Sequence, residues 1–334
     1  MPNPGPGPLG WREKRHEMKI PIAVLIALLI WQFTYSGSAR AALPELPLRA
    51  SSGDWRPLEG KWDKGIQEEL DGSLDRNEFW RRLIDEKKMA VGLVDLSNPD
   101  AVRFARVNGD TMMYAASLAK IAICLAAFQD FEDGGLSETP EIYQELTDMI
   151  RRSSNEAASR MIDRIGLHRI QALIEDPRYR FYDPEKGGGI WVGARYGRGG
   201  ERIPEPIKGL SHAATVTQVC RFYYRLATGQ MISPERSRQM LEIFSTPDLH
   251  DKFVSVMEKT VPLNRLYRKS GQWSVWHADS MLVWDGEWRR YILVAMVEDP
   301  RGEEVLKELV PVVEAILRPG RPRPLGSAHA HRAS

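Results

Sequence analysis

Hydrophobic and polar positions change their period several times along the chain, and each change predicts a different element. Apolar side chains at helical spacing predict two short helices, at 66–70 and 79–84. Two β-strands are predicted next, at 89–96, where the pattern alternates, and at 102–107. The turn residues Asn98-Pro99-Asp100 separate these two runs. The pattern therefore predicts a β-hairpin near the start of the folded region.

A long helical block follows the hairpin, and strands return only late in the chain. Helices are predicted from near Ala116 through 128 and at 141–151, 156–165, 215–227 and 234–244. Strands are predicted at 280–284 and 291–297, on either side of the turn Asp285-Gly286, with a last helix at 303–317. Hairpins without strand–helix alternation indicate an antiparallel sheet. The fold class is therefore α+β, a mixed arrangement of an antiparallel sheet flanked by helices with an inserted all-helical subdomain.

The N-terminal region has the order of features typical of a secretory signal peptide. Four basic side chains between positions 12 and 19 precede an uncharged apolar run at 20–33, and small residues follow at Ser38-Ala39-Arg40-Ala41. We expect residues 1–41 to be a signal peptide cleaved after Ala41, which predicts an exported, periplasmic or extracellular protein. The alternative is an uncleaved anchor, but the run is shorter than the roughly 20 residues that cross a bilayer, and Pro21 lies near its start.

Composition shifts divide the remaining chain into three parts. Residues 42–60 contain several Pro and Gly and are predicted to be a linker, and 61–317 form the folded domain. Residues 318–334 are rich in Pro, Arg and small side chains and are predicted to be a disordered tail.

Charge and cysteine content exclude several classes of function. The 334 residues carry 46 basic and 45 acidic side chains, so no general field attracts polyanions and we expect no nucleic-acid partner. Cys124 and Cys220 allow at most one disulfide and lack the spacing of a zinc or redox motif. The histidines share no metal-ligand spacing, so we expect no metal and no cofactor. We also expect a monomer that acts on a small molecule.

Candidate chemistry begins at Ser117-Leu118-Ala119-Lys120, which opens the most apolar predicted helix of the folded region. Residues i and i+3 lie on one helix face, so the Lys120 amine can reach the Ser117 hydroxyl. A serine needs a neighbouring proton acceptor to attack a carbonyl, and a desolvated lysine can supply one. The pattern alone also fits a helix cap.

Two further short motifs occur later in the chain, and together with the first they form a set that composition alone does not explain. Ser153-Ser154-Asn155 opens a predicted helix, and Lys269-Ser270-Gly271 lies on what the pattern indicates is a late strand. The first two motifs can each occur by chance in a chain of this composition, the third rarely does, and all three in this order and on these elements are not expected by chance.

The three motifs together resemble those of the penicillin-recognising serine acyl-enzymes, specifically the class A beta-lactamase group. Its elements S-x-x-K, S-D-N and K-[ST]-G stand here as SLAK, SSN and KSG in the same order. The resemblance extends to YAASLAKIAI, SSNEAASRMI and ATVTQVCRFYYRLATGQMIS, and it covers roughly 61–317. It implies the beta-lactamase/transpeptidase fold.

The resemblance also implies roles, position by position. Ser117 is acylated, Lys120 relays its proton, and Ser153 protonates the leaving nitrogen. Among the substrate-binding residues, Asn155 hydrogen-bonds the amide side chain of the substrate. Lys269 and Ser270, which lie on the same strand as Gly271, bind the carboxylate of the substrate. The backbone N–H groups of Ser117 and Gln272 form the oxyanion hole.

Two departures from the family pattern bear on the predicted reaction. Ser154 replaces the aspartate of the second motif, and the family's E-x-x-L-N, which holds the glutamate for deacylation, does not occur. The region 176–211 offers Glu185, Glu201 and Glu205, of which Glu185 and Glu201 are the leading candidates for a catalytic base.

We therefore expect an exported serine hydrolase that opens a beta-lactam or a related amide through an acyl-enzyme on Ser117. One alternative is a peptidoglycan DD-peptidase or transpeptidase on the same fold, which the missing E-x-x-L-N favours. Another is a non-catalytic binding relative. The expected partner in the first two cases is a beta-lactam or a peptidoglycan-derived amide, with no membrane contact after the signal segment is cleaved.

Overall fold

The computed structural model describes residues 45–48 and 55–319, besides the first residue. The chain divides into two units, 1–42 and 43–334, and only the second is considered below. The predicted signal peptide and nearly all of the predicted tail lie outside the described residues. No helix in the described ranges is both long and apolar enough to cross a membrane.

The second unit combines α-helices, 3₁₀ helices and strands in a mixed order. The α-helices are α2 (Lys64–Leu74), α3 (Glu78–Asp85), α4 (Lys120–Asp133), α5 (Pro140–Arg151), α6 (Asn155–Ile165), α7 (Leu167–Glu175), α8 (Val216–Ala227), α9 (Pro234–Phe244), α10 (Lys252–Met257) and α11 (Gly302–Leu317). The 3₁₀ helices are η1 (Leu58–Lys61), η2 (Pro99–Ala101), η3 (Ala116–Ala119), η4 (Pro184–Lys186) and η5 (Leu263–Arg265). The strands are β1 (Met89–Asp95), β2 (Arg103–Val107), β3 (Met113–Tyr114), β4 (Tyr182–Asp183), β5 (Gly188–Gly189), β6 (Trp191–Val192), β7 (His212–Ala214), β8 (Leu266–Trp273), β9 (Trp276–Asp285) and β10 (Arg289–Glu298).

The main sheet joins the two ends of the folded domain. Its five strands have the order β2-β1-β10-β9-β8, and every neighbouring pair is antiparallel. The pairing of β1 with β10 runs from Met89 opposite Val297 to Asp95 opposite Tyr291. The helical block α4–α9 is thus inserted between the early hairpin and the late strands, which confirms the predicted α+β fold class.

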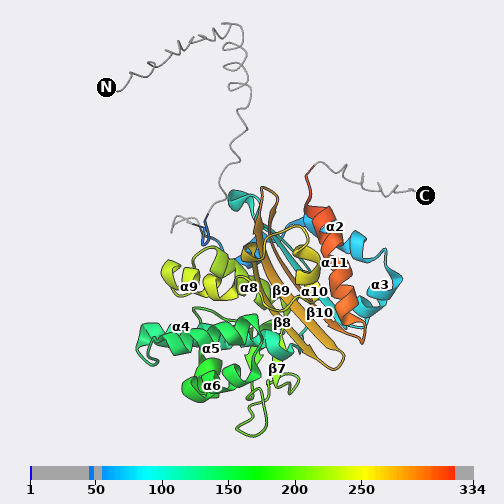
Figure 1. Ribbon diagram of the computed structural model, residues 1–334. Coiled ribbons are helices and arrows are strands. Elements are labelled where there is room, and N and C mark those ends of the chain that lie inside the picture. The colour runs from blue at the N-terminus through cyan, green and yellow to red at the C-terminus, as the bar shows by residue number, and fades with distance from the viewer. Residues whose placement is uncertain (2–44, 49–54, 320–334) are drawn as a thin grey trace, which may run out of the picture. The chain divides into compact units, whose positions relative to one another are not determined.

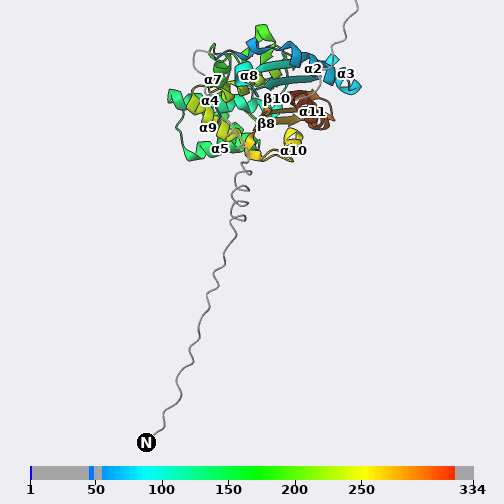
Figure 2. The same ribbon diagram turned by 90° about the horizontal axis from the view of Figure 1, so that it is seen from above.

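Alternating side chains of the central strands feed two hydrophobic cores. Leu93 of β1 and Leu293 of β10 belong to the core shared with α2, α3, α10 and α11. Val94 and Ile292, one position along in each strand, belong to the core shared with α4 and α8. Successive side chains of a strand point to opposite faces of the sheet, and a hydrophobic core covers each face. Every residue of β1 is therefore buried. Figures 1 and 2 show α2, α3 and α11 on one side of the sheet and α4, α5 and α9 on the other.

Helix α4 is the centre of the helical block. Its residues from Lys120 to Phe131 are all buried, so it packs on every side. Cys124 of α4 and Cys220 of α8 are free buried thiols, and the disulfide that the composition permits does not form. Burial raises the pKa of both thiols.

Several boundaries differ from the expected ones. Residues 116–119 form a 3₁₀ turn and not the start of the α-helix, because Ala116 has a φ of 46°, outside the right-handed helical region. Helices α7 and α10 were not predicted, and β9 begins at Trp276, earlier than expected. Within the predicted linker, Leu58 is buried and the Leu48 N–H donates to the Ala227 carbonyl at 2.7 Å, so the described part of this segment packs on the domain.

Candidate active site

Ser117 lies in η3, a turn that leads directly into the buried helix α4. Its side chain is half-buried, whereas Lys120 is fully buried. In a 3₁₀ turn residues i and i+3 eclipse each other, so the nucleophile candidate and the lysine share one side of the turn. Ala116, which precedes the serine, has a φ of 46°. Backbone strain of this kind is found where the surrounding structure holds a functional residue in place.

The Lys120 ammonium is surrounded by neutral acceptors. Its Nζ donates to the Ser153 carbonyl at 2.6 Å and to Asn155 Oδ1 at 2.8 Å, and lies 3.5 Å from Ser153 Oγ. Among the residues that the structure describes, no carboxylate lies within ion-pair distance of it. Burial lowers the pKa of Lys120 from its usual 10.5 to about 7, with a smaller opposing effect from Glu156. Near neutral pH the amine can therefore lose a proton and accept another.

Ser153-Ser154-Asn155 forms the turn before α6 and its first residue. Ser153 has a φ of 59°, in the left-handed region, and its carbonyl and hydroxyl accept hydrogen bonds from the two lysines. Ser154 caps α6, accepting the Ala157 N–H at 3.1 Å. The residue that replaces the family's aspartate is thus used to begin the helix, and Asn155 is left free to accept from Lys120.

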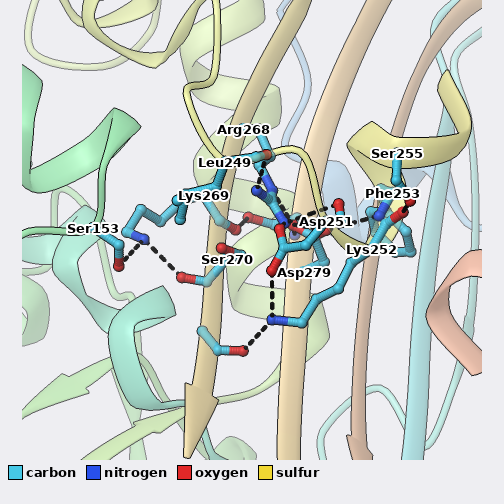
Figure 3. A network of polar contacts seen from close by, with 12 residues as sticks. Ser153, Leu249, Asp251, Lys252, Phe253, Ser255, Arg268, Lys269, Ser270 and Asp279 are labelled. Atoms are coloured by element: carbon cyan, nitrogen blue, oxygen red, sulfur yellow. Dashed lines mark hydrogen bonds and ion pairs between the residues drawn. The ribbon is translucent and has the colours of Figure 1, made fainter. Parts of the chain in front are cut away.

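Lys269 reaches the same serine from the edge strand β8. Its Nζ donates to Ser153 Oγ at 2.9 Å and to the Ser270 carbonyl at 2.7 Å, as Figure 3 shows. Burial lowers the pKa of Lys269 well below its usual value, and the nearby charges of Lys120, Arg268 and Lys252 lower it further. Two lysines from distant parts of the chain therefore meet at one hydroxyl.

Gly271 brings β8 into contact with the nucleophile turn. A Cβ at this position would lie 2.2 Å from the Ala115 carbonyl oxygen and 3.1 Å from the Ser117 nitrogen. Because these neighbours are backbone atoms, they cannot move aside as a flexible side chain can, so only glycine fits here. The next residue, Gln272, has an exposed side chain, and Ser270 is buried.

Tyr196, in the loop between β6 and β7, covers the Lys120 ammonium. The ring centroid lies 4.5 Å from Nζ, and the hydroxyl donates to the Ala116 carbonyl at 3.1 Å. His212 of β7 packs against the ring, with centroids 4.1 Å apart, and burial lowers the pKa of His212 to about 4. The sequence reasoning missed Tyr196, because a tyrosine in a Gly- and Arg-rich loop carries no catalytic pattern.

The three glutamates proposed from this loop region have other contacts. Glu185 is exposed on η4, and Glu201 pairs with His168 at 3.2 Å on the surface. Glu205 is buried, but it accepts the Tyr182 hydroxyl at 2.5 Å and two backbone N–H groups of its own loop. No recorded contact joins any of them to Lys120 or Ser117, so their role as a deacylating base stays a prediction that these contacts do not favour.

A second charged cluster lies behind β8 and was not predicted from the sequence. Arg268 donates to both carboxylate oxygens of Asp279, at 2.7 and 2.8 Å, and to Asp251 Oδ1 at 2.6 Å. Burial alone would lower the pKa of Arg268, but the two carboxylates raise it. Lys252 completes the cluster at 3.6 Å from Asp251 Oδ2 (Figure 3).

No group of three or more His, Cys, Asp or Glu side chains in the described ranges is arranged to hold a metal ion. The chemistry available to the site is that of two hydroxyls, two lysines of lowered pKa and a strand edge with backbone donors. Such a set suits attack on a carbonyl by an activated serine.

Comparison with solved structures shows the beta-lactamase/transpeptidase fold. PBP-A is 18% identical with a TM-score of 0.56, covering 76% of this chain and 96% of its own. A beta-lactamase from Sphaerobacter thermophilus is 17% identical with a TM-score of 0.55, covering 77% and 98%. A mutant of PBP-A, described as an acyl-enzyme complex with penicillin G, is 19% identical with a TM-score of 0.52, covering 78% and 97%.

The sequence itself matches the family described as the beta-lactamase enzyme family, over 77–145 and 138–316. No curated protein matches this chain significantly. The match spans more than half of the chain, so this protein belongs to the beta-lactamase enzyme family, and the resemblance drawn from the three motifs is confirmed.

Proposed function

We propose that the protein is a penicillin-recognising serine acyl-enzyme that is acylated at Ser117 and releases the acyl group slowly. Its substrate is a beta-lactam or a peptidoglycan-derived amide. The observation that carries this proposal is the meeting of Lys120 and Lys269 at Ser153, beside the turn that holds Ser117. This arrangement supplies a nucleophile, a base near neutral pH and a proton donor for a leaving nitrogen.

The proposed reaction moves one proton through the site. Ser117 Oγ attacks the amide carbonyl carbon while its proton passes to the Lys120 amine, and the carbonyl π electrons form an oxyanion at the N–H groups of Ser117 and Gln272. The oxyanion then reforms the carbonyl as the C–N bond breaks. The leaving nitrogen takes a proton from Ser153, which is restored by Lys120. The product is an ester on Ser117 and an amine, which leaves when the substrate is a linear amide and stays attached to the acyl group when it is a beta-lactam.

Two hydrogen bonds prepare Lys120 for this role. As a neutral amine it has two N–H groups, and it has two close acceptors in the Ser153 carbonyl and Asn155 Oδ1. Its lone pair is then free to take the proton of Ser117. A lysine paired with a carboxylate would instead hold its third proton.

The surroundings of Lys120 favour slow deacylation. Hydrolysis of the ester needs a base that activates water, and no carboxylate among the described residues lies within ion-pair distance of Lys120. The candidates Glu201 and Glu205 have contacts elsewhere. We therefore place the protein nearer to the peptidase alternative than to a fast beta-lactamase. Export by the N-terminal segment, cleavage after Ala41 and a monomeric state belong to the same proposal.

Mass spectrometry after incubation with penicillin G tests the proposal. We expect a stable adduct on Ser117 in the wild type and none in Ser117→Ala, while Ser154→Ala, which changes the neighbouring helix cap, keeps the adduct. Rapid turnover of nitrocefin without an accumulating adduct would instead support a beta-lactamase. Absence of labelling by both penicillin G and a fluorophosphonate probe would support a non-catalytic binding relative.

A further inference from the structure

Lys252, the first residue of α10, is a buried lysine that the proposed mechanism does not use. Its side chain is 1% exposed, and its backbone has a φ of 46°, in the left-handed region. A non-glycine residue adopts this conformation at a cost, and it persists where its surroundings fix it. The position of this ammonium is thus closely determined by the fold.

Lys252 Nζ donates to the Gly271 carbonyl oxygen at 3.0 Å. Figure 3 shows the Lys252 side chain extending from its helix toward the strands of the sheet. Gly271 belongs to the third motif, and its position faces the Ser117 turn. The contact therefore joins the buried cluster behind β8 to the strand that borders the site.

Charge balance does not require this contact. The cluster contains two cations, Arg268 and Lys252, and two carboxylates, Asp251 and Asp279. Asp279 also accepts the Phe253 N–H at 3.1 Å, which anchors the first turn of α10 to the sheet. The carboxylates thus hold the lysine in place, and one of its N–H groups is directed at Gly271.

The Gly271 carbonyl and the Gln272 N–H belong to the same peptide group. This peptide is trans, so the two bonds point in opposite directions across the strand. A cation hydrogen-bonded to the carbonyl oxygen draws electrons from the amide nitrogen and makes its N–H a stronger donor, as in chains of hydrogen bonds that polarise one another. The ammonium acts on one side of the strand, and the N–H on the other.

We infer that Lys252 is a positioning residue for acylation, because its ammonium orients and polarises the peptide group whose N–H, that of Gln272, stabilises the oxyanion. The inference rests on the proposed function, since it needs an oxyanion to form at Ser117. Lys252 does not touch the substrate. It acts through the Gly271–Gln272 peptide, whereas the peptide that carries the Ser117 N–H has a neutral donor, the Tyr196 hydroxyl, at its Ala116 carbonyl.

The test compares Lys252→Met with a matched control, Lys208→Met. Lys208 also donates to a backbone carbonyl, that of Met112, at 2.7 Å, but this carbonyl lies outside the third motif. Removing a whole oxyanion-hole donor costs about 10² to 10³ in rate, so weakening one should slow acylation by penicillin G about tenfold. Lys208→Met should acylate at the wild-type rate. Lys252→Arg, which keeps a positive donor, should recover most of the loss.

A spectroscopic readout separates polarisation from a loss of structure. The infrared stretch of the ester carbonyl in the acyl-enzyme reports the strength of its hydrogen bonds, so it should move to higher frequency in Lys252→Met and stay in place in Lys208→Met. If Lys252→Met does not fold, the double variant with Asp251→Asn removes both members of the buried pair and is measured instead. An unchanged carbonyl frequency and acylation rate in the folded variant would overturn the inference. If the proposed function itself is wrong, neither penicillin G nor a fluorophosphonate probe will label Ser117 in the wild type. That result would overturn the inference as well.

Discussion

Two pairs of buried cations lie on opposite sides of β8, and their partners differ. Lys120 and Lys269 meet at Ser153, where the recorded hydrogen-bond acceptors are carbonyl, amide and hydroxyl oxygens. Arg268 and Lys252 lie behind the strand with two carboxylates. Cations that are equally buried thus lie in two different electrostatic environments at one edge strand.

The difference shows that partners, together with burial, decide what a buried cation can do. Without a carboxylate in ion-pair contact, Lys120 has a pKa that burial lowers to about 7, which makes it a candidate base. With two carboxylates, the pKa of Arg268 is raised although burial opposes this, and the residue is fixed as a cation, whereas burial still lowers the pKa of Lys252. The first pair is suited to moving a proton, and the second to holding the strand.

The largest expected effect follows from removing the base. Lys120→Met should slow acylation of Ser117 by about 10² to 10⁴, the usual contribution of a positioned general base, as measured by the rate of penicillin labelling. Lys307→Met, which removes a surface lysine paired with Glu303, serves as the control. Labelling of Lys120→Met at the wild-type rate would contradict the assignment of proton transfer to the first pair, since another residue would then have to act as the base.

The same variant should change how stability depends on pH. The pKa of Lys120 is about 7 in the folded chain and near 10.5 in the unfolded one, so the unfolded state binds the extra proton between these values. The wild type should therefore gain stability relative to Lys120→Met as pH rises through this window. Below pH 7 the lysine is charged in both states, and the full cost of burying the cation lowers the stability of the wild type. Urea unfolding at about pH 6 and about pH 9 measures the difference. An equal free energy difference at both pH values would contradict it.

Breaking the paired cluster should cost stability. Asp279→Asn leaves Arg268 buried with one carboxylate in place of two, and breaking such buried pairs typically costs about 3–5 kcal/mol. Unfolding in urea should show this loss. Asp248→Asn, which removes an exposed partner of Arg152, should cost at most about 1 kcal/mol. Similar losses in the two variants would show that the cluster is not the anchor that its contacts indicate.

A smaller effect is expected from the ring over the first pair. Tyr196→Leu removes a cation–π contact of about 0.5–2 kcal/mol that favours the charged lysine. The pKa of Lys120 should then fall, and the acid limb of the acylation pH profile should move down by about 0.4 to 1.5 pH units. Tyr196→Phe keeps the ring and loses only the bond to Ala116, so its limb should stay in place. If the acid limb moved in Tyr196→Phe and not in Tyr196→Leu, the shift would come from the position of the Ala116 backbone and not from the cation–π contact.

The smallest effect is expected from the exposed carboxylate that acts on Lys120. Glu156 raises the pKa of this lysine, so Glu156→Gln should move the acid limb to lower pH by a few tenths of a unit, and added salt should abolish the shift. Glu185→Gln and Glu201→Gln are matched controls, expected to change neither the limb nor the lifetime of the acyl-enzyme. A longer lifetime in either control would restore that residue as the deacylating base.

Sequence patterns predicted the elements that depend on local periodicity. The hairpin of β1 and β2 and the helices α5, α6, α8 and α9 were found because their apolar positions repeat at the right spacing. Helix α10, of six residues, is too short for a period to be seen, and the loop strands β4–β7 have two or three residues each. The pairing of β1 with β10 follows from the fold as a whole.

The candidate site was predicted only where a motif marked it. Ser117, Lys120, Ser153 and Lys269 were identified from three short patterns, and the structure brings Lys120 and Lys269 to Ser153. Tyr196, Glu156 and Lys252 carry no pattern, because their effects depend on distances between remote segments. The glutamates were chosen by chemical type within the right region, and type alone does not determine where a side chain points.

The pairing of the first strand with the last ones has a consequence for synthesis. Ser117 is made about 150 residues before Lys269, and β8 has its place in the sheet only after β10 has joined β1. A growing or truncated chain that ends before β8 holds the nucleophile turn without the strand that lines it. Contacts between segments so far apart in the chain form slowly, and the site is complete only in a chain that has been made through β8.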